Sequence, residues 1–318
     1  MGLIAVLFPP KDRKDGIRKS DFVFFHSLRA LASFVIILLI SIIVLLVWQS
    51  REILMRDGLS FLWRNEWNPN ENIYGALPFI YGTLMTSLVA LVIAIPVSVS
   101  CALFITELCP RWLKAPLSFL IEMLAAIPSV VYGLWGIFVL APAVREYIQP
   151  GLGKSMGFIP LFQGPHFGIG ILAASIVLAI MILPTITTMS REVFNAIPQL
   201  TREAALTLGA TRWEMIFMSV LKTATPGIFG AVVLGLGRAM GETMAVTMVI
   251  GNRADISWSL FSPGATMASV IANEYPEAST NLYLSALTAI GVALFLVSLL
   301  VNLLARLIVS RFEKKVGG

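Results

Sequence analysis

The sequence predicts an all-α, polytopic membrane protein with six transmembrane helices. Of its 318 residues, 57% are hydrophobic and only 13% are charged. Soluble domains are usually about 45–50% apolar and about 25% charged. The apolar residues also fall into long runs, and a bilayer core about 30 Å thick needs roughly 20 such residues in a helix. A soluble enzyme and a nucleic-acid-binding protein are therefore excluded, although the net charge is +5.

Six runs are long enough to cross the bilayer. The first carries no charge, is too long for a secretory signal and lacks a small-residue cleavage site, so we expect it to be retained. Pro128 breaks the third run and Pro184 lies inside the fourth. The expected spans are 30–48, 84–104, 117–140, 169–189, 227–250 and 282–309.

Positive charge sets the expected orientation. Of the 23 Lys and Arg residues, 16 lie on the side of the two termini and six on the other, while Arg238 lies inside the fifth run. Cytoplasmic loops of membrane proteins carry the excess of Lys and Arg. We therefore expect both termini in the cytoplasm.

No pattern indicates a metal or nucleotide site. The two histidines lie far apart, and the two cysteines form neither a CxxC pair nor a disulfide framework. Gly153-Lys154-Ser155 matches only the end of a phosphate-binding P-loop and lies in a loop expected outside the cell. We expect no cofactor and no metal, and any ATP would be bound by another subunit.

The segment between the fourth and fifth runs, about 190–225, is amphipathic. Gly209 is typical of a helix stop. Thr211 and Glu214 then have the spacing of a capping box that starts a second helix. This pattern predicts a helix, a tight turn and a helix on the cytoplasmic side, although an ordinary interfacial hairpin has the same spacing. One helical stripe carries the apolar residues Ile197, Leu200, Ala204 and Leu208.

The same segment resembles the EAA motif of ABC-importer permeases. The resemblance rests on Glu203, Ala204, Ala205 and Gly209. In that family a short coupling helix carries the motif and docks in a groove of the ATPase, so the resemblance implies that role for these four residues. The family pattern continues with Ile-x-Leu-Pro, of which 219–222 keeps only the leucine.

Three further segments resemble permeases of phosphate-specific ABC importers. They are 75–83 (GALPFIYGT), 126–133 (AIPSVVYG) and 235–245 (GLGRAMGETMA). The resemblance runs from about residue 61 to the C-terminus. It implies a type I ABC-importer permease core in a bacterial inner membrane. The implied partners are a homologous permease, cytoplasmic ATPase subunits and an extracytoplasmic phosphate-binding protein, and the chain itself would catalyse no reaction.

The expected domain organisation follows from the spans and the resemblance together. It consists of a cytoplasmic arm (1–29), a first helix (30–48), an extracytoplasmic segment (49–80), a five-helix permease domain (81–309) and a cytoplasmic tail (310–318).

A charged pair lies inside the fifth run. Arg238 is close to the expected midplane, where an Arg costs about 2.5–3.5 kcal/mol on the translocon scale. Glu242 is four residues on, and Glu122 of the third run is a second candidate partner. One interpretation is structural: an ion pair at this position only fixes the orientation of the helices in the bundle. Five glycines of this run are expected to permit close helix approach: Gly227, Gly230, Gly235, Gly237 and Gly241.

The pair also fits an oxyanion passage. The guanidinium of Arg238 offers a planar fork for two phosphate oxygens. The carboxylate of Glu242 accepts the O–H that phosphate carries near neutral pH and sulfate lacks. The family resemblance points to Arg238 and Glu242 as well. Together with Glu122, the second candidate partner of Arg238, they form the expected substrate pathway.

Three alternatives stay open. The chain could be the sister permease of the same system or a permease for another oxyanion. An ion-coupled secondary transporter would need inverted repeats or broken helices with ion ligands, and the two halves show no such match. A membrane scaffold without transport activity would have no reason to carry the EAA–Gly loop.

Overall fold

The chain is predominantly helical over the part that the computed structural model describes, residues 19–316. Over this range it forms no strand, and the only sheet-like contacts are two isolated bridges. Six helical segments are long and apolar enough to cross a membrane, which confirms the predicted fold class. Most of the predicted cytoplasmic arm and the last two residues of the predicted tail lie outside the described residues.

Helix α10 (Ile171–Ala196) is the centre of the bundle. In its most apolar stretch 72% of the residues are buried, and it packs against α5 (Leu77–Leu103) and α13 (Lys222–Met240). Small residues such as Ala90 and Ala94 let α5 approach closely. The Ser98 hydroxyl donates to the carbonyl of Leu183 at 3.2 Å and adds a polar contact between these two helices.

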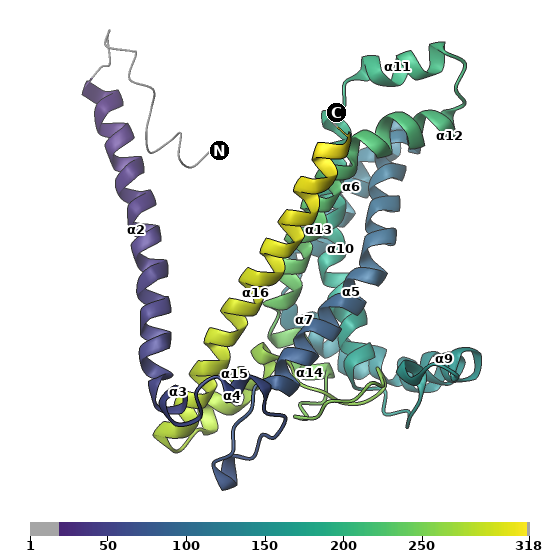
Figure 1. Ribbon diagram of the computed structural model, residues 1–318. Coiled ribbons are helices and arrows are strands. Elements are labelled where there is room, and N and C mark those ends of the chain that lie inside the picture. Colours follow the sequence, from purple (N-terminus) through teal and green to yellow (C-terminus); the bar gives the residue numbers. More distant parts are fainter. Residues whose placement is uncertain (1–18, 317–318) are drawn as a thin grey trace.

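Helix α2 (Lys19–Gln49) stands apart. None of its most apolar stretch is buried, and Figure 1 shows it clear of the bundle along most of its length. It contacts α16 (Asn281–Val316), and α3 (Arg51–Asp57) joins it to the rest of the chain. A helix that is apolar on every side and has so few contacts is suited to a lipid environment.

The third crossing is interrupted as predicted at Pro128. Helix α6 (Arg111–Ala126) ends before it, because the residue preceding a proline is driven out of the helical region, and Ile127 has φ −66° and ψ 128°. Helix α7 (Ser129–Trp135) starts a new helical run that continues well past the predicted end at residue 140. That run passes through η3 (Gly136–Leu140), α8 (Ala141–Ala143) and η4 (Val144–Ile148) into α9 (Gln149–Met156).

The P-loop-like triplet is therefore helical. Gly153, Lys154 and Ser155 all lie within α9, so they do not form a phosphate-cradling loop. After η5 (Pro160–Phe162) the chain enters α10.

The predicted fifth span, 227–250, is wrong as a single helix. The crossing begins earlier, with α12 (Arg212–Met215) and η6 (Ile216–Leu221), and α13 ends at Met240. A separate short helix, α14 (Met244–Val249), follows the break at 241–243. Because the stretches on either side of the break, 231–237 and 244–250, are largely apolar, the hydropathy of the run did not reveal it.

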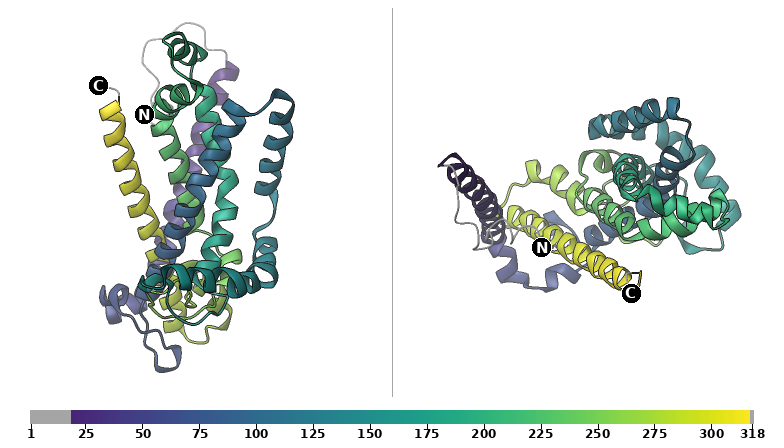
Figure 2. Two further views of the ribbon diagram at one scale, coloured as in Figure 1. Left: turned by 90° about the vertical axis from the view of Figure 1, so that its right-hand side faces the viewer. Right: turned by 90° about the horizontal axis from the view of Figure 1, so that it is seen from above.

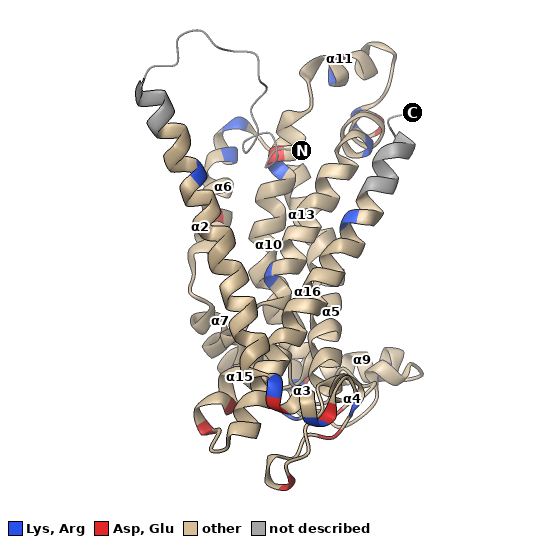
Figure 3. Cartoon of the chain, turned by 60° about the vertical axis from the view of Figure 1, so that its left-hand side comes forward, with Lys and Arg blue, Asp and Glu red and all other residues tan. Residues whose placement is uncertain are grey.

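The end of the bundle opposite α11 (Gln199–Thr207) and α12 is closed by short elements. They enclose an aromatic cluster, in which the Trp67 indole and the Tyr283 hydroxyl both donate to Glu274 Oε2, at 2.8 and 2.6 Å. Figure 2 shows these elements gathered at one end, and Figure 3 shows most of the charged residues at the two ends of the bundle. Besides α3, the elements are α4 (Ser60–Trp63), η1 (Pro69–Glu71), α15 (Met267–Glu274) and η7 (Tyr275–Glu277).

Candidate functional site: a cationic groove and an exposed coupling segment

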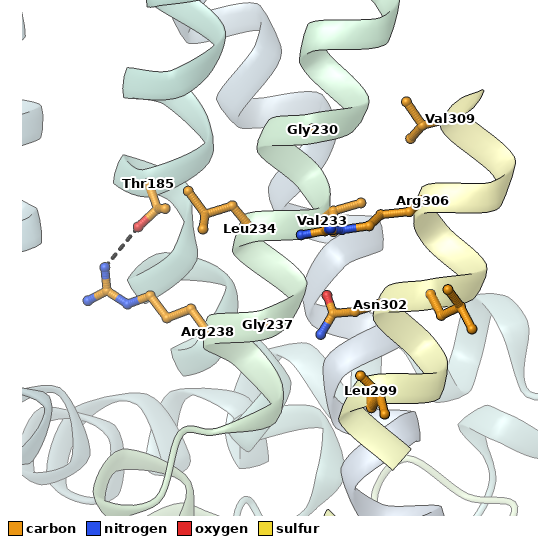
Figure 4. Close-up of a pocket in the computed structure, with 11 residues that line it drawn as sticks. Thr185, Gly230, Val233, Leu234, Gly237, Arg238, Leu299, Asn302, Arg306 and Val309 are labelled. Atoms are coloured by element: carbon orange, nitrogen blue, oxygen red, sulfur yellow. Dashed lines mark hydrogen bonds between the residues drawn. The ribbon is translucent and has the colours of Figure 1, made fainter. Parts of the chain in front are cut away.

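An open groove of about 870 Å³ lies between α13 and α16. Each helix contributes one stripe of residues spaced three or four apart, so one face of each helix borders the groove. Figure 4 shows the lining: Gly230, Val233, Leu234, Gly237 and Arg238 on α13, Leu299, Asn302, Leu303, Arg306 and Val309 on α16, and Thr185 on α10.

Arg238 is exposed in this groove. Its Nη1 donates to Thr185 Oγ1 at 2.8 Å (Figure 4), and it forms no ion pair within the described residues. The helix break places Arg238 in the last turn of α13, where the helix dipole favours a cation. The remaining guanidinium donors are available to a ligand.

The predicted Arg238–Glu242 pair is not formed. Glu242 lies in the break after α13, so the two residues no longer share a helical face. The half-buried Glu242 side chain instead accepts a hydrogen bond from the backbone N–H of Ala245 at 3.3 Å. There it also faces the positive end of the α14 dipole.

Glu122 also has a different partner from the one expected. It lies on α6 and accepts a hydrogen bond from Arg191 Nη2 of α10 at 3.2 Å. The structure therefore does not bring Glu122 to Arg238.

Besides Thr185, two polar residues of the groove, both on α16, escaped the sequence prediction. Arg306 was counted only among the 16 cations on the side of the two termini, and Asn302 was not considered. The available signal was their spacing of four in an otherwise apolar stretch, which puts both on one face of α16. No group of three His, Cys, Asp or Glu side chains that could hold a metal ion occurs in the described part of the chain.

The predicted helix–turn–helix between the fourth and fifth crossings is confirmed. Helix α11 is followed by Gly209 at φ +89°, and the capping box of α12 is present. The Thr211 N–H donates to Glu214 Oε2 at 2.7 Å, and the Glu214 N–H donates to Thr211 Oγ1 at 3.3 Å. A Cβ on Gly209 would meet nothing within 4 Å, so backbone conformation alone calls for glycine there.

The outer face of α11 is exposed and partly apolar. Figure 1 shows α11 standing out from the bundle. Glu203 and Ala204 are exposed and Ala205 is half-buried, while Leu200 and Leu208 are 76% and 88% exposed. Such a surface is typical of a site where another protein binds.

The inner face of α11 is fixed to the bundle by Arg202. Its Nε and Nη2 donate to Glu107 Oε1 at 3.1 and 2.8 Å. Its Nη1 and Nη2 also donate to the carbonyls of Ile197 and Phe194, at 2.6 and 2.8 Å. Glu107 lies in η2 (Phe104–Leu108), directly after α5, and its side chain is only 8% exposed. The outward position of α11 is thus held by a largely buried network.

Residues 94–316 match the family described as "Binding-protein-dependent transport system inner membrane component". Two similar relatives are phosphate transport system permease proteins PstC. The protein of Xylella fastidiosa strain Temecula1 is 47% identical over 96% of this chain and 95% of its own length. That of Pasteurella multocida is 48% identical over 93% and 94%. A probable PstC of Methanocaldococcus jannaschii is 36% identical over 82% and 85%.

Solved structures of importers share the fold. A bacterial ABC transporter involved in import of the acidic polysaccharide alginate covers 91% of this chain and 98% of its own, with TM-score 0.55 and 18% identity. The MetNI methionine ABC transporter, in an inward-facing conformation, covers 74% and 94%, with TM-score 0.54 and 17% identity.

Proposed function

Because the chain belongs to the family of binding-protein-dependent transport system inner membrane components, we propose that it is the permease through which an ATP-driven importer moves inorganic phosphate. It is a multi-pass membrane protein of the type I ABC-importer fold. A permease of this kind works with an ATPase and a binding protein. The nearly full-length likeness to phosphate permeases supports phosphate as the substrate.

The observation that carries this proposal is the exposed Arg238 inside the membrane-spanning region. An uncompensated cation there is costly unless protein or a water-filled cavity covers it. Its only hydrogen-bond partner within the described residues is the uncharged Thr185. The guanidinium can therefore bind two oxygens of a phosphate ion that enters the groove.

A homologous PstA-like permease would cover this face. The groove between α13 and α16 is open, and the exposed Arg238 borders it. Two related permeases joined in pseudo-twofold fashion would enclose the passage between them. This arrangement would keep phosphate and Arg238 away from lipid.

The two glutamates would have different roles. Glu242 would accept the O–H of phosphate and so help to distinguish phosphate from sulfate. Glu122 is neutralised by Arg191, so its part in the pathway would be indirect, through the contact between α6 and α10.

Coupling to ATP hydrolysis would occur at α11. Glu203, Ala204, Ala205 and Gly209 would form the helix and turn that dock on a PstB-like ATPase, which would hydrolyse the ATP. A PstS-like binding protein would deliver phosphate at the opposite end. Both termini and α11 would then lie in the cytoplasm.

Orientation has a direct test. With Cys101 and Cys109 replaced, Lys154→Cys should react with a membrane-impermeant thiol reagent in intact cells, and Lys222→Cys should not. The reverse pattern would place α11 outside and remove it from the ATPase.

Phosphate uptake by proteoliposomes that hold the whole complex tests the function. We expect uptake that requires ATP and the binding protein and that excess sulfate does not inhibit. Inhibition by sulfate equal to that by phosphate would favour a permease for another oxyanion. Uptake by the chain alone, driven by an ion gradient, would favour a secondary transporter.

A further inference from the structure

Arg306 is a second guanidinium in the groove. It lies on α16, four residues after Asn302, and both residues border the groove. Figure 4 shows its side chain reaching across toward Val233 of α13 rather than along α16 toward the end of that helix. An Arg that only anchored the helix end would be expected to extend toward the bilayer surface.

Nothing in the described part of the chain neutralises Arg306. It is exposed, and it forms no hydrogen bond or ion pair there. The groove lining holds Arg238 as well and contains no carboxylate. Two cations without a counterion make the groove attractive to an anion.

Arg238 and Arg306 border the groove from opposite helices. Helix α13 carries the chain away from the α11 end, and α16 returns it toward that end. Arg306 is level with Val233, which precedes Arg238 by five residues on α13. An anion that moves along the groove from Arg238 toward the α11 end would pass Arg306.

Small residues leave space beside these cations. A Cβ on Gly230 would meet nothing within 4 Å, and one on Gly237 would meet only Asn302 Oδ1 at 4.0 Å. Packing within this chain therefore does not require glycine at either position, and larger side chains would narrow the groove.

Asn302 supplies a hydrogen-bond acceptor. Its Nδ2 donates to the Ser298 carbonyl at 2.9 Å, which leaves Oδ1 directed toward Gly237. A carbonyl oxygen accepts an O–H but repels a fully deprotonated oxyanion. Inorganic phosphate carries such an O–H near neutral pH, whereas the phosphodiester of a lipid headgroup does not.

We propose that Arg306 and Asn302 form a second phosphate-type oxyanion site, which receives inorganic phosphate from Arg238 on the way to the α11 end of the groove. This inference rests on the proposed function. It adds a binding step beyond Arg238.

Protection of an introduced cysteine tests the site without relying on transport. The probe is Val233→Cys in the assembled complex, with Cys101 and Cys109 replaced, treated with a water-soluble thiol reagent. Saturating inorganic phosphate should lower the rate of thiol modification about threefold or more, because an oxyanion bound to Arg306 would cover the introduced thiol. Sulfate should protect less.

Variants assign the protection to Arg306. Arg306→Gln should abolish it, and Arg306→Lys, which keeps the charge, should restore part of it. Arg111→Gln is the matched control, because Arg111 is an exposed Arg expected on the same side of the membrane and does not border the groove. Phosphate uptake should fall about tenfold in Arg306→Gln, the effect of roughly 1.4 kcal/mol, and stay native in Arg111→Gln. Equal losses in the two variants would overturn the site.

Lipid composition separates the two sources of the oxyanion. Vesicles of phosphatidylcholine alone are compared with vesicles that also contain phosphatidylglycerol. Protection that follows phosphatidylglycerol and not added phosphate would make the site a headgroup site and overturn the transit step.

If the complex imports phosphate and needs Arg238, but phosphate never protects the introduced thiol of the Val233→Cys variant, this inference fails while the proposed function stands. If the complex imports no phosphate at all, both fail.

Discussion

The two faces of α13 use the same small residues for opposite purposes. On the face that packs against α10, a Cβ on Gly227 would come within 2.5 Å of Val193, and one on Gly235 within 2.8 Å of Ile186. On the groove face, a Cβ on Gly230 would meet nothing within 4 Å. On the first face glycine lets α13 pack closely against α10, and on the second face glycine leaves space in the groove. Residue type alone therefore does not reveal the role of a glycine in a transmembrane helix.

The largest effect is expected on the packed face. Gly235→Phe places a ring where Ile186 already lies, and overpacking of this size costs about 3 kcal/mol or more. We expect loss of the folded permease from the membrane, measured as its yield after detergent extraction. Gly230→Phe is the matched variant on the open face and should fold normally while blocking phosphate uptake. Normal yield of Gly235→Phe would show that α13 and α10 are not tightly packed.

Arg238→Lys should give the next largest effect, and it concerns the open face alone. Lysine keeps the positive charge but loses the planar fork. Phosphate uptake should fall roughly ten- to hundredfold, as expected when a hydrogen bond to a charged group is lost. Yield and co-purification of the partner permease should stay native. Loss of the partner permease instead would make Arg238 a structural residue.

Helix α11 also has two faces with different roles. Arg202 holds its inner face against the bundle, and its outer face is exposed. Gly209→Val breaks the turn between α11 and α12, because φ +89° is strained for a β-branched residue by about 1–3 kcal/mol. We expect uptake to fall about fivefold, with normal insertion and weaker retention of the ATPase on purification. Gly209→Asn, which tolerates positive φ better, is the control. Uptake at the native rate in Gly209→Val would contradict the coupling role.

Glu242→Gln should have the smallest effect on rate and a specific effect on selectivity. The amide can turn its N–H₂ toward any oxyanion, whereas the carboxylate requires a protonated one. We expect reduced phosphate uptake and stronger inhibition by sulfate, about several-fold relative to the unmodified protein. Unchanged sulfate inhibition would remove Glu242 from the site.

Local patterns predicted local structure well. The capping box of Thr211 and Glu214 and the interruption at Pro128 each depend on a few neighbouring residues, and both are present in the structure. The break after Met240 was missed, because the apolar stretches 231–237 and 244–250 flank it and together read as one span. That error put Glu242 on the same helical face as Arg238.

Long-range contacts were beyond what one sequence shows. Glu122 was assigned to Arg238 because both are charges in apolar runs, whereas the packing of α6 on α10 gives it Arg191. Arg306 was only counted among the 16 cations on the side of the two termini, and the arrangement of α13 and α16 reveals that it borders the groove.

The Arg202 network has a mechanical consequence. One guanidinium ties α11 both to the last turn of α10, through Phe194, and to the residues that follow α5, through Glu107. When a partner pushes or pulls on the outer face of α11, α11, α5 and α10 would therefore move together as one rigid unit. Without this network, α11 could rotate by itself and the movement would not reach the bundle. Because α13 continues directly from α12 and η6 and is packed on α10, it would be carried along. The movement would then change the contact between α13 and α16, which is where Arg238 and Arg306 border the groove.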